Sequence, residues 1–217
     1  MGWLLALDTT AEFGSLALLR DGELEEEVPL HSSDGFGHVI FGAIESILAK
    51  HGLTPHDIGC YAGATGPGSF TGVRVGLTVI KGLGDATRRP VVGVSNLQAM
   101  ATFGALALRA VLLDARRGEV YGAVYDEWLH AVQPEAVIRF SDWVAGLPEG
   151  AEVIGQDFTP FADHLRDWRL VQAPRALAAA IGRIAWREWL AGQAVDAAAL
   201  DANYVRRSDA ELLWKEM

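Results

Sequence analysis

Residues 4–10 read LLALDTT, an apolar run that ends at an aspartate and two threonines. Four consecutive apolar residues bounded by a polar turn are typical of a buried strand. Residues 14–20 form a second apolar segment, and the pair Asp21-Gly22, which favours a tight hairpin, leads into residues 23–29. The sequence therefore predicts that the chain begins as an antiparallel meander of three strands.

The same pattern returns in the middle of the chain. Residues 109–114, RAVLLD, again place an apolar run before an aspartate, and residues 119–126, EVYGAVYD, alternate as a strand does. A repeated unit of strand, aspartate turn and strand favours two related halves. We expect a first half over residues 1–106 and a shorter second half over residues 107–217, whose last helix is a candidate to return to the first half.

Apolar spacing and turn residues predict alternating helices and strands elsewhere, and hence the α/β class. Ser95 and Ser141 are candidate helix caps. The predicted helices cover residues 38–50, 72–86, 96–106, 173–191 and 209–216, with a short one after Ser141, and the predicted strands cover residues 58–64, 90–94, 136–140, 152–155 and 203–207.

Composition narrows the class of protein. The chain has 217 residues, of which 50% are hydrophobic, so it can bury a sizeable core. Its formal net charge of −10 repels phosphate backbones and disfavours nucleic-acid binding by the chain alone. Cys60 is the only cysteine, which excludes a disulfide framework and a thiolate metal site. The first ten residues lack the charged start and the length of a signal peptide or a membrane span, so a cytoplasmic protein is expected.

Residues 66–74, GPGSFTGVR, join a predicted strand to a predicted helix. Such a turn offers backbone N–H groups at a helix N-terminus, which suits an anion, and Ser69 or Thr71 suits a helix cap. The P-loop spacing that starts at Gly63 lacks its lysine because Ser69 stands there, and the G-x-S-x-G order of a nucleophile elbow is absent. A structural turn and cap is favoured over an anion cradle, and both interpretations stay open.

Asp8 stands at the end of the first predicted strand beside the hydroxyls of Thr9 and Thr10. A carboxylate and hydroxyls in such a turn suit a phosphate or a Mg²⁺ ion with its water. They also suit hydrogen bonds within their own turn, which is the favoured of the two interpretations. The histidines lack the i, i+4 spacing of a helical metal site, so no metal site is predicted: His31 and His38 are seven apart, and His51 and His56 are five apart.

Four segments, taken in order, resemble the TsaB family, also called YeaZ. The resemblance extends over about residues 4–126, and beyond it only NYVRR resembles the family's C-terminal Tyr-x-Arg segment, without its usual proline. It implies an α/β fold of the actin/Hsp70 (ASKHA) type, with two related mixed-sheet halves flanked by helices. The four segments are residues 4–24, 63–83, 90–101 and 112–125.

The resemblance also implies a function. TsaB-like proteins are non-catalytic subunits that support the formation of threonylcarbamoyladenosine on tRNA, as scaffold or activator of the transferase TsaD, with TsaE as accessory ATPase. A homodimer is implied for the chain alone and a heterodimer with TsaD, with tRNA contacted only through the complex and no membrane involved. No catalytic residue, metal or cofactor is expected, apart from a vestigial cradle for ATP and Mg²⁺ at Asp8, Thr9, Gly68 and Ser69.

The helices that begin near His38 and Gly72 are implied to form the dimer surface. The loop before the first of them, HSSDGFG at residues 31–37, departs from the family's His-Ser-Glu-x-Leu-Leu-Pro pattern, which leaves the register of the interface open. The alternatives are an active ATPase or sugar-kinase-like enzyme of the same fold, and, less favoured, a peptidase. The implied interface residues are Phe36, Val39, Ile40, Ala43, Ile44, Ile47, Val73, Arg74, Leu77, Ile80 and Lys81.

Overall fold

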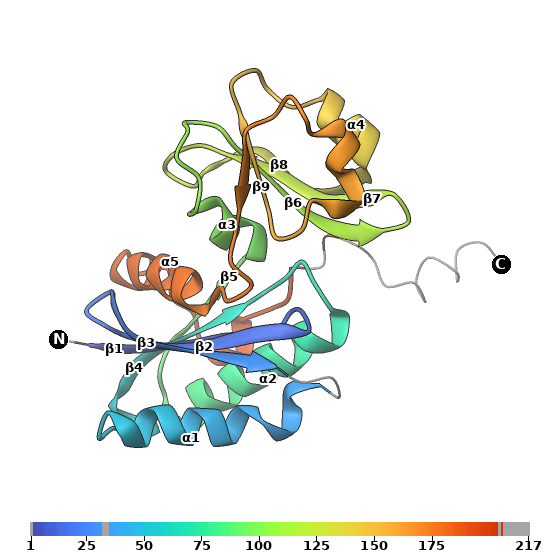
Figure 1. Cartoon of the computed structure of the whole chain (residues 1–217). Coiled ribbons are helices and arrows are strands. Elements are labelled where there is room, and N and C mark those ends of the chain that lie inside the picture. Colours follow the sequence, from blue (N-terminus) through green and yellow to red (C-terminus); the bar gives the residue numbers. More distant parts are fainter. Residues whose placement is uncertain (1, 32–34, 204, 206–217) are drawn as a thin grey trace.

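Two mixed five-stranded sheets, one in each half of the chain, form the frame of the molecule (Figure 1). The computed structural model describes residues 2–31, 35–203 and 205. The first sheet has the order β3-β2-β1-β4-β5 and the second the order β10-β9-β6-β7-β8. The strands are β1 Trp3–Asp8, β2 Phe13–Arg20, β3 Glu23–His31, β4 Ile58–Ala64, β5 Val91–Val94, β6 Arg109–Arg116, β7 Glu119–Tyr125, β8 Ala131–Arg139, β9 Glu152–Gly155 and β10 Leu170–Gln172.

The predicted repeat of the two halves is present in the strand pairing. Strand β1 pairs with β2 antiparallel and with β4 parallel. Strand β6 pairs with β7 antiparallel and with β9 parallel, which is the same arrangement. The two halves of the chain are therefore built on one plan.

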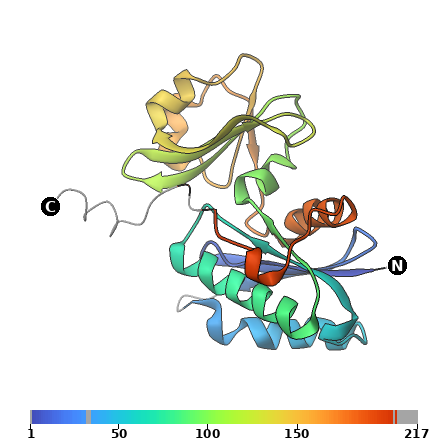
Figure 2. The same ribbon diagram turned by 180° about the vertical axis from the view of Figure 1, so that it is seen from behind.

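Helices cover both faces of the first sheet (Figures 1 and 2). Helices α1 and α2 pack on one face, whereas α3 and α5 lie on the other face, between the two sheets. Helix α4 packs on the far face of the second sheet. The helices are α1 Ile40–Lys50, α2 Phe70–Thr87, α3 Asn96–Ala101, α4 Phe140–Ala145 and α5 Ala178–Leu190, with short 3-10 turns at Phe36–His38, Pro55–Asp57, Thr159–His164 and Ala197–Ala199.

The apolar run that opens the chain is continuous because both faces of β1 are buried. Leu5 and Leu7 belong to the core cluster under α1 and α2. Leu4 and Ala6, on the alternate face, belong to the cluster under α3 and α5, together with the buried Cys60. A strand covered on both faces has no polar positions to alternate with.

Helix α5 begins five residues later than the sequence predicts, at Ala178 instead of residue 173. Its first N–H groups donate to side chains of the first sheet, from Ala178 to Ser15 Oγ at 2.9 Å and from Ala179 to Glu27 Oε1 at 3.0 Å. The preceding residues include Pro174, which disfavours helix at the residue before it. The second half thus sends a helix back onto the first sheet, and side chains of that sheet fix where the helix starts.

Other elements also differ from the sequence prediction: β8 covers Ala131–Arg139 instead of residues 136–140, and α1 begins at Ile40 instead of residue 38. The helix expected over residues 96–106 ends at Ala101, because later N–H groups of that segment bond elsewhere. Ser141 does not cap α4, which starts at Phe140, and its hydroxyl donates to Asp142 Oδ1 instead. Strand β10 has no predicted counterpart. The predicted helix at 209–216 and most of the predicted strand at 203–207 lie outside the described residues.

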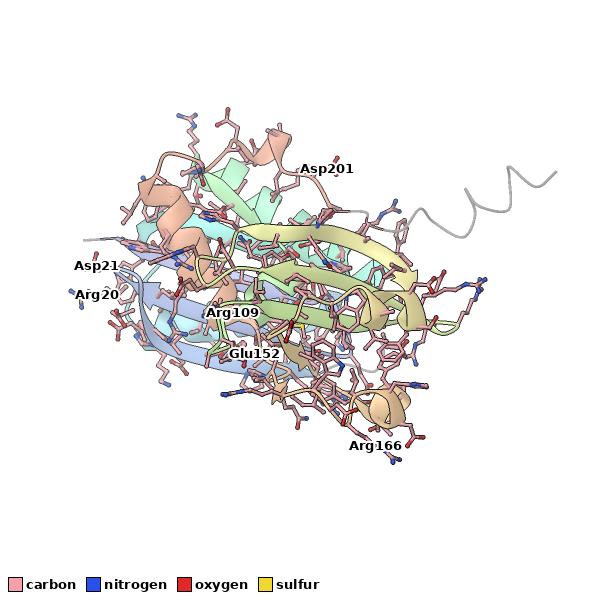
Figure 3. The ribbon with its side chains drawn as sticks, turned by 90° about the horizontal axis from the view of Figure 1, so that it is seen from above. Arg20, Asp21, Arg109, Glu152, Arg166 and Asp201 are labelled. Carbon is pink, nitrogen blue, oxygen red and sulfur yellow. The ribbon has the colours of Figure 1, made fainter. Side chains whose placement is uncertain are left out.

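The junction between the halves is held by a buried carboxylate. Glu152 is fully buried, and its Oε1 accepts hydrogen bonds from the N–H groups of Ala105 and, at 2.6 Å, of Leu106. Its Oε2 lies 3.3 Å from Arg169 Nε. Arg109 donates to the carbonyl oxygens of Leu106 and Ala101, and Figure 3 shows Arg109 beside Glu152. The connection that contains residues 106 and 107 is therefore fixed from both sides.

A strap that we define as residues 191–203 follows α5 and runs across α2 towards the second half (Figure 2). Val195 pairs with Val91 and so covers the edge of the first sheet. Leu200 O accepts a hydrogen bond from Lys81 Nζ at 2.8 Å. Asn203 Nδ2 donates to Glu135 Oε2 at 2.6 Å, and Glu135 belongs to β8. The strap therefore connects α2 to both sheets.

Replacing Glu152 by alanine should loosen the junction. The change leaves two backbone N–H groups without their acceptor and Arg169 without its ionic partner, so we expect the free energy of unfolding to fall by about 2–4 kcal/mol. Urea unfolding measures this, with Glu149→Ala as the matched control because Glu149 is exposed nearby. A loss for Glu152→Ala no larger than that of the control would show that the junction does not depend on this carboxylate.

Candidate functional site

The two turns that the sequence singles out lie against each other at the end of β1. Ser69 N donates to Thr10 O at 2.6 Å. Thr9 Oγ1 donates to Gly72 O at 2.8 Å. The predicted cradle residues Asp8, Thr9, Gly68 and Ser69 are thus brought together in one place by contacts between the two turns.

These contacts bring the backbones of the two turns so close that neither Gly68 nor Gly72 has room for a side chain. A Cβ atom at Gly72 would collide with the carbonyl oxygen of Thr9, and one at Gly68 would collide with that of Thr10. Helix α2 is capped from within, because Ser69 Oγ accepts from Gly72 N at 3.3 Å. Thr9 O and Thr10 O face the two glycines and Ser69 N is already used as a donor to Thr10 O, so fewer N–H groups are left for an anion between the turns. The geometry agrees with a structural turn and cap.

The side chain of Asp8 accepts hydrogen bonds within its own turn. It is buried, and Oδ1 accepts from Thr10 N at 2.9 Å and from Thr10 Oγ1 at 2.7 Å. Asn96 Nδ2 lies 3.4 Å from both carboxylate oxygens and donates to Thr10 Oγ1 at 2.7 Å. Burial raises the pKa of Asp8, against the lowering effect of the hydrogen bonds from Thr10 and Asn96. Within residues 2–31, 35–203 and 205, no group of three His, Cys, Asp or Glu residues is placed to hold a metal ion.

The candidate nucleophiles, Ser69 and Cys60, serve structural roles in the fold. Ser69 Oγ is engaged at the start of α2, as described above. Burial raises the pKa of the Cys60 thiol to about 12, so the thiol stays protonated at neutral pH. His31 and His51 lie beside the carboxylates of Glu12 and Glu26, at 3.3 Å and 2.9 Å. These arrangements do not assemble the nucleophile and base of a peptidase.

The implied interface on α1 and α2 needs correction. Seven of its eleven residues point into the core of the first half instead of towards solvent. The apolar stripe at i, i+3 and i+4 spacing is the face with which these helices cover the sheet, so it is not available to a partner. The buried seven are Phe36, Ile40, Ile44, Ile47, Val73, Leu77 and Ile80.

The outer surface of the two helices carries an apolar groove of about 590 Å³. Phe41 is 60% exposed at one wall, and Arg74 lies at the other, with its guanidinium 3.8 Å from the centre of the Phe70 ring. The helix pair therefore offers a partner an apolar surface with one cation. The groove, which we call the α1–α2 groove, is lined by Gly37, Phe41, Arg74, Val75, Thr78, Val79, Gly82 and Leu83.

Four residues of the implied interface reach the surface, namely Val39, Ala43, Arg74 and Lys81. Arg74 lines the groove, whereas Lys81 is turned to the strap. Phe41, Val75 and Leu83 line the groove but are not among the residues that the resemblance implies. A signal for the exposure of Phe41 was available, because Phe41 lies beside the stripe of Ile40, Ile44 and Ile47 that packs on the sheet.

Comparison with known structures first defines the class of protein. The fold aligns with component A of (R)-2-hydroxyglutaryl-CoA dehydratase from Acidaminococcus fermentans over 87% of this chain and 99% of that chain, with a TM-score of 0.54 at 9% identity, which is a likeness of fold alone. YeaZ from Pseudomonas aeruginosa aligns over 94% of this chain and 100% of that chain, with a TM-score of 0.81 at 26% identity. The predicted fold, two mixed-sheet halves of the actin/Hsp70 type, is confirmed.

The sequence comparisons then give the family. The model of TsaD, tRNA N6-adenosine threonylcarbamoyltransferase, matches residues 27–175, and the chain belongs to this family. It is similar to the tRNA threonylcarbamoyladenosine biosynthesis proteins TsaB of Escherichia coli, at 38% identity over 63% of the chain and 62% of that protein, and of Bacillus subtilis, at 32% identity over 67% and 66%. The resemblance to TsaB is thereby confirmed, and the matched stretches span just under two thirds of these relatives.

In the described part of the chain, no helix is both long enough and apolar enough to cross a membrane.

The contact between the two turns predicts opposite effects for two glycines of α2. Gly72→Ala should lower the free energy of unfolding by roughly 1–3 kcal/mol, because its Cβ collides with Thr9 O. Gly82→Ala should raise it by about 0.5–1 kcal/mol, because Gly82 has open space around it within the same helix. Urea unfolding of both variants tests the pair, and equal effects would contradict the close packing at Gly72.

The buried carboxyl of Asp8 predicts a pH dependence of stability. Because its pKa is raised by folding, its contribution is present below the ordinary pKa of 3.8 and is lost as pH rises through the raised value. The stability of the wild type relative to Asp8→Asn should therefore fall as the pH rises above about 4, as measured by urea unfolding.

Asp57→Asn serves as a control for which the pH dependence of stability has the opposite sign. The side-chain hydrogen bond from Thr54 lowers the pKa of Asp57, so its contribution is lost as pH falls. A wild-type advantage over Asp8→Asn that grew with pH would show that Asp8 is stabilised as a carboxylate.

Proposed function

We propose that the chain is a TsaB-type subunit that supports the formation of threonylcarbamoyladenosine on tRNA without carrying out the transfer itself. Its partner is TsaD, which it activates or holds as a scaffold. The observation that carries the proposal is the contrast between two places on the molecule. At the turn of Asp8, the carboxylate, the Thr9 hydroxyl and Ser69 N all make hydrogen bonds within the chain, whereas the α1–α2 groove is open and apolar.

The groove suits a partner that presents helices. An apolar hollow beside exposed Phe41, with Arg74 at its wall, offers the aromatic and cationic anchors that dominate protein interfaces. TsaD belongs to the same family as this chain and can present a corresponding helix pair. In the absence of TsaD, the chain would pair with a second copy through the same face, because a two-fold dimer uses the same surface patch on both subunits.

The net charge of the chain and the internal hydrogen bonds of the turn at Asp8 bear on the roles of tRNA and TsaE. A chain of net charge −10 suits a complex in which tRNA is held mainly by other subunits. The chain needs no nucleotide or metal of its own, and TsaE supplies the accessory ATPase. The complex is placed in the cytoplasm, where tRNA is modified.

The direct test is threonylcarbamoyl transfer to tRNA by TsaD and TsaE from the same organism, with and without this chain. Product that forms only when the chain is present supports the proposal. Unchanged product, together with Mg²⁺-ATP binding by the chain that Asp8→Ala abolishes, would favour the ATPase interpretation instead.

Phe41→Asp tests the groove itself. A carboxylate at the exposed aromatic position places a charge in the apolar contact, so we expect the dissociation constant for TsaD to rise roughly 30-fold or more. The matched control is Trp128→Asp, because Trp128 is 70% exposed on the second half, away from the groove. Equal losses of affinity for the two variants would place the partner elsewhere.

A further inference from the structure

The hairpin turn between β6 and β7 has an unusual backbone. Arg116, Arg117 and Gly118 are consecutive and all left-handed, with φ angles of 67°, 56° and 77°. Left-handed conformations at two residues of a hairpin turn favour Asn, Asp and Gly, not a long side chain. The corresponding turn of the first half carries the expected pair, Asp21-Gly22, at φ angles of 52° and 85°.

The strained turn is held firmly. Arg116 N donates to Asp114 Oδ1 at 2.7 Å, and Phe140 N donates to Gly118 O at 3.0 Å. The pairing register shifts between Asp114 and Arg116, which marks a bulge at the same place. A backbone fixed on both sides cannot relax to the conformation that arginine prefers, so the strain persists.

Neither arginine is needed by the core. The Arg116 side chain is 87% exposed, and its guanidinium lies 3.5 Å from Asp114 Oδ2, an exposed ion pair of the kind that contributes little to stability. Arg117 is exposed as well. Strained residues that do not serve packing concentrate at binding and catalytic sites.

The turn lies across a cleft from the residues that precede α2. Arg116 lines a cleft of about 260 Å³ between the two halves, opposite Gly68 of the first half. Gly68 directly precedes the cap of α2, and α2 forms one wall of the α1–α2 groove. Figures 1 and 2 both place α4, whose first residue bonds to the turn, on the same side of the molecule as the beginning of α2.

We propose that Arg116 and Arg117 contact the phosphate backbone of tRNA held by the complex, an inference that rests on the proposed function. Guanidinium groups match phosphate in geometry and charge. The α1–α2 groove, where the protein partner docks, is apolar and lies outside this turn. Two arginines provide a local contact and not the main binding surface, which fits the net charge of −10.

The proposal predicts that stability and tRNA binding respond in opposite directions. Arg117→Asn creates the Asn-Gly pair that such a turn prefers, and Arg116→Asn places a residue that tolerates the left-handed region. We expect the double Asn variant to have a Tm unchanged or raised by roughly 1–4 °C. Its KM for an unmodified tRNA transcript, in the complex with TsaD and TsaE, should rise about tenfold with little change in kcat.

Two further variants serve as controls. Arg88→Asn removes another exposed arginine with a left-handed backbone, at φ 54°, but this residue caps the opposite end of α2. It should leave the KM for tRNA unchanged. The double variant Arg116→Lys, Arg117→Lys keeps both charges, so its tRNA binding should depend on salt as that of the wild type does. In the double Asn variant, the slope of log K against log[salt] should fall in magnitude by about one to two.

The outcomes separate this inference from the function on which it rests. A wild-type complex that makes no modified tRNA refutes the proposed function, and this inference with it. An active complex in which the double Asn variant leaves the tRNA KM and salt slope unchanged refutes this inference alone. Unchanged tRNA binding with weakened affinity for TsaD would also overturn it, because the arginines would then contact an acidic protein surface.

Discussion

The close contact between the turn at Asp8–Thr10 and the turn at Gly68–Gly72 is the constraint on which the rest of the structure depends. The carbonyl oxygens of Thr9 and Thr10 approach glycines that no other residue could replace without a shift. This contact sets where α2 begins, and α2 in turn forms one wall of the α1–α2 groove. The same contact engages Ser69 N, which would otherwise be free at the start of α2. One packing interaction thus fixes the start of α2 and, with it, one wall of the groove.

The two halves are also joined in a way that suits a scaffold. Glu152 fixes the connection between them, α5 returns from the second half to cover the first sheet, and the strap closes with the hydrogen bond from Asn203 to Glu135. Each of these links resists movement of one half against the other. A surface that must hold a partner in one geometry gains from such rigidity, because less ordering is required on binding.

Much of this could be predicted from local sequence. The apolar run of β1, the pair Asp21-Gly22 and the repeat at Asp114 indicate the opening meander and the repeated strand-turn-strand unit, because period and turn chemistry are local properties. The start of α5 could not be predicted, since it depends on Ser15 and Glu27, which are distant in sequence. Glu152 was missed for the same reason, because its partners belong to a connection far from it in the chain.

The candidate site was predicted less well than the fold. Apolar spacing shows which helix face is apolar, but the face that covers the sheet and the face that meets a partner can both be apolar. The interface implied by resemblance therefore included Ile44 and Leu77, which are buried in the core, whereas Phe41, which is exposed, was not among its residues. Nor could the strain at Arg116 and Arg117 be predicted, because backbone angles follow from the bulge in a hairpin and not from the residues alone.

The most direct test of the central claim is an experimental structure of this chain in complex with TsaD and Mg²⁺-ATP. The account predicts that TsaD covers Phe41 and the α1–α2 groove, that the hydrogen bond from Ser69 N to Thr10 O is intact, and that no nucleotide lies between the two turns of this chain. A nucleotide phosphate bound between those turns, or a partner docked away from α1 and α2, would contradict it.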